Sequence, residues 1–226
     1  MHVRDKSPQL GKTKYALSPT DQDALLNARE SAHDSVTLKD LQQRISDFTG
    51  CNLKSTALST VFSDGTPGSR VMLIGEAPGR EEDEQGLPFV GRSGQLLNKM
   101  LASINLQRTD VYLSNIVPWR PPGNRAPTPI EIEICRPFIE RHIELAHPKF
   151  LVLLGGSSAK TLLKTSNGIM SLRGKWRSIE IAGRLIPAIP LLHPAYLLRQ
   201  PSQKRLAWQD LLKIKKNLDI EDGSQT

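Results

Sequence analysis

The chain has 226 residues and a formal net charge of +7, with 30 Lys and Arg against 23 Asp and Glu. Its hydrophobic content of 38% is too high for a disordered protein, and its two cysteines are too few for a disulfide framework. The first ten residues lack the apolar core of a signal peptide, and no apolar run is long enough to span a bilayer. We therefore expect a soluble, cytoplasmic, monomeric globular protein with no membrane contact.

The positive charge is concentrated in the C-terminal third. Residues 151–218 hold twelve Lys and Arg against two Asp and Glu, a net charge of +10, so the rest of the chain sums to −3. Such a segment is typical of proteins that bind a polyanion such as DNA, although a solvated surface with no partner has the same composition.

The predicted elements begin with a polar arm over residues 1–35, partly disordered and partly helical, with a helix over 20–33. A second helix follows over 38–49, and from residue 71 short apolar runs alternate with helical patterns. The predicted strands are 71–74, 111–117, 150–154 and 185–192, and the predicted helices between and after them are 93–104, 129–146, 157–164 and 202–218. This alternation predicts one α/β domain over 36–220, a three-layer αβα arrangement around a central, mostly parallel four-stranded sheet, followed by a tail at 221–226.

Three motifs stand where predicted strands end, and parallel sheets form their sites at the carboxyl ends of the strands. The first is a Gly- and Pro-rich turn at 75–79, which lets the backbone approach a ligand closely. The second is Asn115, whose carboxamide suits the edge of a base, although Asn also caps turns. The third is His193, followed by Pro194. A lone His is more often structural than catalytic, but this position at a strand end favours a functional role.

These motifs resemble family 4 of the uracil-DNA glycosylase superfamily. The matching stretches are GEAPGREEDEQGLPFVGRSGQLL at 75–97, VYLSNIVPWRPPGNR at 111–125, ICRPFIERHIEL at 134–145 and HPAYLLR at 193–199. The resemblance covers about residues 38–218 in the family's order and spacing. It implies a uracil-DNA glycosylase-like fold and a monofunctional enzyme of base-excision repair. Such an enzyme flips deoxyuridine out of single- or double-stranded DNA, hydrolyses its N-glycosidic bond, and leaves an abasic site.

The resemblance also implies the residues of the substrate pocket. Asn115 would read N3–H and O4 of uracil, which excludes cytosine, and His193 would donate to O2 as negative charge builds there. Glu76 is the first candidate for positioning water or stabilising the sugar cation, with Glu82 and Asp83 as alternatives. The expected substrate-binding residues are Ala77, Pro78, Glu82, Phe89 and Asn115, with Phe89 stacking on the flipped ring.

Gly79 stands where family 1 enzymes have the tyrosine that excludes the thymine methyl group. Either another group, with Glu82 as the candidate, guards that face, or thymine is rejected less strongly. The expected DNA contacts are the cations and polar side chains that flank the motifs and a leucine pair that would wedge into the duplex: Arg120, Asn124, Arg125, Leu197, Leu198, Arg199, Lys204 and Arg205.

The chain departs from family 4 at the iron–sulfur site, which usually holds a [4Fe-4S] cluster on four cysteines. Cys51 and Cys135 match two of those positions, but Phe48 and Trp119 stand at the other two, and neither ring can ligate iron. We expect two buried free thiols, no bound metal, and no cofactor in the chemistry.

Three alternatives to a turnover uracil-DNA glycosylase have less support in the sequence. Relatives that become covalently attached to uracil DNA carry a basic, His-containing insertion, but the loop at 121–127 has none, which favours a turnover enzyme. A non-catalytic protein that binds uracil or damaged DNA would have no need to keep His193, Asn115 and Phe89. A hydrolase of small nucleotides would not explain the basic C-terminal third.

Overall fold

The computed structural model describes residues 18–223, with side chains described as far as Asp219. The helices are α1 (Pro19–His33), α2 (Leu38–Asp47), α3 (Leu53–Thr56), α4 (Arg80–Gln85), α5 (Arg92–Ala102), α6 (Pro129–Ala146), α7 (Gly156–Leu163), α8 (Ile169–Leu172), α9 (Pro194–Arg199) and α10 (Lys204–Gly223). The strands are β1 (Asp64–Gly65), β2 (Val71–Gly75), β3 (Val111–Asn115), β4 (Phe150–Leu154), β5 (Arg177–Ile181) and β6 (Arg184–Leu191). Among the described helices, none is both long and apolar enough to cross a membrane.

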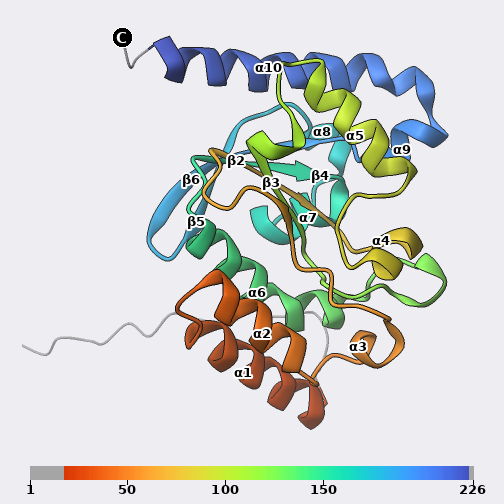
Figure 1. Ribbon diagram of the computed structural model, residues 1–226, viewed down its shortest axis with the longest axis vertical. Helices are drawn as coiled ribbons and strands as arrows, with labels where there is room; N and C mark the ends of the chain where they lie inside the picture. The colour runs from red at the N-terminus through yellow and green to blue at the C-terminus, as the bar shows by residue number, and fades with distance from the viewer. Residues whose placement is uncertain (1–17, 224–226) are drawn as a thin grey trace, which may run out of the picture.

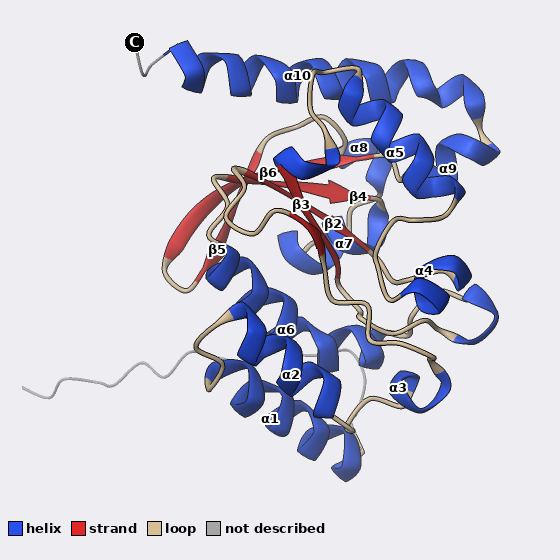
Figure 2. Cartoon of the chain, viewed as in Figure 1, coloured by secondary structure: helices blue, strands red, loops and turns tan. Residues whose placement is uncertain are grey.

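One six-stranded sheet with the order β1-β3-β2-β4-β6-β5 forms the centre of the molecule (Figure 2). Its four inner strands are parallel, and β1 and β5 pair antiparallel at the two edges. The predicted parallel sheet is confirmed, but the count of four strands is wrong because both edge strands were missed. The turn at Ala182 and Gly183 joins β5 to β6 with φ angles of +48° and +76°, a hairpin geometry in which glycine is a readable signal.

Helices cover both faces of the sheet, as the three-layer prediction requires (Figure 1). Successive strand residues point to opposite faces, so Met72 and Ile74 pack with α1, α2, α6 and α7. Val71 and Leu73 pack with α5, α9 and α10 on the other face. Each face is apolar because these parallel strands are buried on both sides.

The N-terminal part of the described chain belongs to this core. Helix α1 lies along α6 and buries Ala24, Leu25, Ala28 and Ala32. We therefore propose to begin the domain at α1 rather than at residue 36. Residues 1–17 of the predicted arm and 224–226 of the predicted tail lie outside the described residues.

The parallel register brings the ends of four strands to one edge of the sheet. Gly75 at the end of β2 pairs with Asn115 at the end of β3, and Leu154 of β4 pairs with Leu191 of β6. The three motifs, at 75–79, Asn115 and His193, lie at or just after these strand ends. The fold therefore brings together motifs that are far apart in the sequence.

Candidate active site

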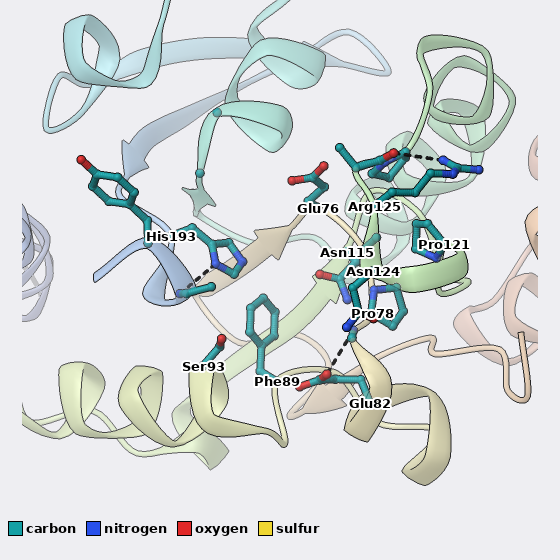
Figure 3. Close-up of a pocket in the computed structure, with 18 of the residues that line it drawn as sticks. Glu76, Pro78, Glu82, Phe89, Ser93, Asn115, Pro121, Asn124, Arg125 and His193 are labelled. Atoms are coloured by element: carbon teal, nitrogen blue, oxygen red, sulfur yellow. Dashed lines mark hydrogen bonds between the residues drawn. The ribbon is translucent and has the colours of Figure 1, made fainter. Parts of the chain in front are cut away.

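A cavity of about 620 Å³ lies at this edge of the sheet (Figure 3). It is lined by the turn after β2, the turn before α5, the end of β3, the loop at 121–127, the start of α7, and α9. Ten of the predicted site residues line it: Glu76, Ala77, Pro78, Glu82, Phe89, Asn115, Asn124, Arg125, His193 and Arg199.

Asn115 presents a free carboxamide to the cavity. The residue is only 6% exposed, and no hydrogen bond from the described residues reaches its side chain. A β-carbon at Gly75 would lie 2.3 Å from its Oδ1 atom, so only glycine at position 75 allows this placement. An amide so largely shielded from bulk water gains when a ligand pairs with it.

His193 is held as a neutral donor. Its Nδ1 atom accepts a hydrogen bond of 3.1 Å from the N–H of Ala195, which leaves the ring proton on Nε2. Burial, together with the positive charge of Arg199, lowers the pKa of His193 from 6.5 to about 4, although Glu82 opposes this shift. The imidazole therefore remains uncharged at neutral pH with an Nε2–H available to a ligand.

Glu76 points into the cavity from the turn after β2 (Figure 3). No hydrogen bond from the described residues reaches its carboxylate. Burial raises the pKa of Glu76 above its ordinary value of 4.5. A carboxylate without protein partners is suited to hold water or to face a positive charge.

The carboxylates of Glu82 and Asp83, by contrast, accept hydrogen bonds from backbone N–H groups. Glu82 accepts hydrogen bonds from the N–H groups of Gly79, Val90 and Gly91 at 2.9 to 3.1 Å. Asp83, 2% exposed, accepts from the N–H groups of residues 58 and 59. The structure therefore disfavours both alternatives to Glu76 as the water-positioning acid.

Phe89 forms one wall of the cavity. Its ring lies over Gly75, where a β-carbon would come within 2.6 Å of Cζ, and its centroid is 6.1 Å from that of His193. Phe89 is 5% exposed and has a φ angle of +55°, which a residue with a side chain adopts only when its surroundings hold it there. Between Phe89, Asn115 and His193, the cavity offers an aromatic face, an amide edge and a neutral N–H donor.

The loop between β3 and α6 orders itself with its own polar groups. Arg125 donates to both carboxylate oxygens of Glu131 at 2.7 and 2.9 Å and holds the pKa of Glu131 below its usual range. Thr128 caps the start of α6, and its N–H donates to Glu131 at 2.7 Å. Arg120 donates to Asn124 at 2.7 Å. These three predicted DNA contacts, Arg120, Asn124 and Arg125, are thus partly engaged within the loop.

The residues of α9 and α10 separate into two groups. Leu197 is 1% exposed and packs in the core, so the predicted wedge pair reduces to the half-buried Leu198. Arg199, Lys204 and Arg205 are exposed, and of these only Arg199 also lines the cavity.

The site residues named from the sequence did not include Ser93, Gly155 and Tyr196, which also line the cavity. Gly155 follows β4 with a φ angle of +95°, and a β-carbon there would lie 3.1 Å from that of His193. The strand-end rule pointed to the segments 155–158 and 193–199, which contain Gly155 and Tyr196, and the matched stretch at 75–97 contains Ser93.

The family's cluster position is filled by aromatic side chains. Phe48 stacks on Trp119 with ring centroids 6.4 Å apart and meets Phe138 edge-on at 5.0 Å. Cys51 and Cys135 are buried free thiols beside them, and the hydrogen bond between them, with burial, holds the pKa of Cys135 well above its usual range. Across residues 18–223 no group of three or more His, Cys, Asp or Glu side chains is placed to hold a metal. These residues do not fit a four-cysteine cluster.

Comparison with known proteins agrees with this geometry. The model of the Uracil DNA glycosylase superfamily matches residues 62–212. A type-4 uracil-DNA glycosylase of Archaeoglobus fulgidus is 37% identical over 182 residues, 79% of this chain and 92% of that protein. Type-4 uracil-DNA glycosylases of Thermotoga maritima and Saccharolobus solfataricus are 36% and 38% identical, over 77% and 74% of this chain and 91% and 80% of those proteins. The chain therefore belongs to the uracil-DNA glycosylase superfamily and, within it, to the type-4 family.

Proposed function

We propose that the protein is a monofunctional uracil-DNA glycosylase that releases uracil from DNA and leaves an abasic site. The observation that carries this proposal is one cavity that holds a neutral His193 Nε2–H and a free Asn115 carboxamide beside the ring of Phe89. Asn115 matches the hydrogen-bonding edge of uracil, Phe89 its ring face, and His193 the negative charge that develops as uracil departs. Lysines are absent from the cavity lining, which argues against a Schiff-base lyase.

The bond between uracil and deoxyribose breaks with positive charge on the sugar and negative charge on the base. Asn115 accepts from N3–H and donates to O4, and cytosine presents the opposite pattern. His193 donates its Nε2 proton in a hydrogen bond to O2, where charge accumulates. Glu76 faces the sugar, stabilises its cation and holds the attacking water, because its carboxylate has no protein partner.

Thymine is excluded by Glu82 through its position rather than through proton transfer. Its Oε2 atom lies 2.7 Å from the place a β-carbon of Gly79 would take, so the carboxylate fills the space above that glycine. Three backbone N–H groups fix it there. A rigid group at this position leaves no room for a methyl group on the flipped base.

The DNA crosses the mouth of the cavity along α9 and the start of α10. Arg199, Lys204 and Arg205 are exposed there without ion pairs to described residues, and they suit phosphate groups. Leu198 is the side chain that opens the stack. We propose that the protein acts as a monomer on either single- or double-stranded DNA. We also propose that it binds no iron–sulfur cluster, because the rings of Phe48 and Trp119 occupy two of the four ligand positions.

Incubation of a labelled uracil-containing oligonucleotide with the protein should produce abasic sites that alkali converts to breaks. Asn115→Ala and His193→Ala should each lower kcat/KM by at least about a hundredfold, the usual loss from one oriented group in a dry site. His33→Ala, an exposed histidine on α1, is the matched control and should retain the wild-type rate. Breaks before alkali treatment, or wild-type rates from either cavity variant, would contradict the proposal.

The rate should fall in acid as Glu76 takes up a proton. Burial raises its pKa, so activity is present above that pKa and is lost as the pH drops through a value higher than the ordinary 4.5. His193 stays neutral down to about pH 4, so it does not produce this loss. Glu76→Gln should lower the rate by about a hundredfold or more and remove the acid limb from single-turnover pH profiles. The exposed Glu84→Gln is the control, and an unchanged acid limb in Glu76→Gln would exclude Glu76.

Protein purified without oxygen should be colourless and contain no stoichiometric iron, because Phe48 and Trp119 occupy two of the four ligand positions. The measurements are metal analysis and the broad absorbance that iron–sulfur clusters show near about 400 nm. One cluster's worth of iron per chain would show that other ligands replace the missing cysteines.

Leu198→Ala should slow the release of uracil from duplex DNA by about tenfold and leave single-stranded DNA nearly unaffected, because a wedge matters only where a stack must open. Leu185→Ala is the control, since Leu185 is exposed near the start of β6, away from the carboxyl edge of the sheet. Equal slowing of both substrates by Leu198→Ala would remove the wedge role.

A further inference from the structure

The turn that carries Phe89 is held from outside the cavity by Arg108. Its Nη1 atom donates to the carbonyl of Phe89 at 3.0 Å, and its Nη2 atom donates to the carbonyl of Pro88. Nη1 also reaches Oδ1 of Asn98 on α5, at 3.2 Å. Arg108 itself lies just before β3, outside the cavity lining and outside the motifs that carry the family resemblance.

A second residue orients this guanidinium. The Nε atom of Arg108 donates to Oδ2 of Asp64 at 2.5 Å, and both side chains are largely shielded from solvent. Asp64 lies on β1, which pairs with β3 at the edge of the sheet. The guanidinium is therefore anchored to the sheet through Asp64 and donates to two carbonyl groups of the turn. A planar fork of donors can satisfy this geometry, whereas the single ammonium of lysine cannot.

The turn needs such support because Phe89 has a left-handed backbone. Gly94 makes room beneath it, since a β-carbon there would fall 1.7 Å from the carbonyl oxygen of Phe89. Glu82 binds the following N–H groups of Val90 and Gly91. The carboxylate of Glu82 thus binds the two N–H groups that follow Phe89, and the guanidinium of Arg108 binds the carbonyl groups of Pro88 and Phe89. Together they hold Phe89 in a backbone conformation that is unfavourable by itself.

We propose that Arg108 is a positioning residue that sets the ring of Phe89 at the height and angle needed to stack on the flipped base. The proposal rests on the stacking role proposed for Phe89. Arg108 is not among the residues that line the cavity, and its guanidinium is bound to Asp64 and to the turn, so on this proposal its loss leaves the phosphate contacts intact. A ring displaced by about 1 Å misaligns the base against Asn115 and His193, and such displacements lower kcat more than they weaken binding.

The test is a double-mutant cycle on single-turnover rates with a uracil oligonucleotide. Arg108→Gln should lower the maximal rate by about thirtyfold and change the DNA dissociation constant by less than about threefold. Phe89→Ala should lower the rate at least as much. In the Phe89→Ala background, Arg108→Gln should cost less than about threefold more, because the ring it positions is gone. Arg108→Lys should remain well below wild type, because one ammonium cannot replace the fork.

Asp64→Asn provides a milder variant that keeps the guanidinium, in case Arg108→Gln does not fold. It should slow the rate by about fivefold, and that loss should also disappear in the Phe89→Ala background. Arg44→Gln removes a matched Arg–Asp pair on α2 and should leave the rate unchanged. Thermal unfolding of each variant identifies losses that come from stability alone.

The possible results distinguish failure of the positioning role of Arg108 from failure of the stacking role of Phe89 or of the glycosylase function. If the losses from Arg108→Gln, or from Asp64→Asn, multiply with that from Phe89→Ala, the positioning role is wrong although Phe89 still stacks. If Phe89→Ala keeps the wild-type rate, the stacking role of Phe89 is wrong and the inference falls with it. Absence of uracil release by the wild-type protein would instead overturn the proposed function.

Discussion

The cavity exists because the central strand ends in a residue without a side chain. Gly75 lies under both the amide of Asn115 and the ring of Phe89, at distances that a β-carbon would make impossible. The parallel pairing of β2 with β3 places Asn115 directly beside it, so the amide and the ring meet over one backbone position. At Gly155, which follows β4, a β-carbon would make a tight contact of 3.1 Å with that of His193, and the φ angle of +95° there favours glycine. The missing side chains allow groups from separate loops to approach within the dimensions of one base.

Burial shifts the pKa values of His193 and Glu76, which both line the cavity, by one physical cause. Removing a charge from water is unfavourable, so the pKa of His193 falls while that of Glu76 rises. The imidazole is thereby kept neutral as a donor at any pH near 7. Because burial disfavours the charged form of Glu76, its carboxylate gains most when a positive charge forms next to it. Arg199 also lines the cavity, and its positive charge contributes to the lowered pKa of His193.

The sequence predicts this site well where side chains follow strand ends, and poorly where backbone groups are the partners. Asn115 and His193 could be located from the strand-end rule and the motifs alone. The three backbone N–H groups that bind Glu82 leave no mark in the sequence, nor do the carbonyls bound by Arg108. Leu197 looked like part of an exposed pair because helix α9 is too short for a periodic pattern to identify its buried face. The edge strands were missed for a similar reason, since β1 has two residues and β5 buries only one face.

The aromatic packing at the family's cluster position bears on the cavity through the loop between β3 and α6. Trp119 stands at the start of that loop and Cys135 in the helix that follows it, while Phe48 comes from the end of α2. A group that joins these three segments holds the cavity wall in place, whether it does so by metal–thiolate bonds or by apolar contact. Stacked and edge-on rings bury a large area and prefer defined angles, so they can perform this task. The residues proposed for the chemistry, Asn115, His193 and Glu76, line the cavity, whereas the aromatic side chains at the cluster position do not. Replacing one structural staple by another therefore leaves the proposed chemistry intact.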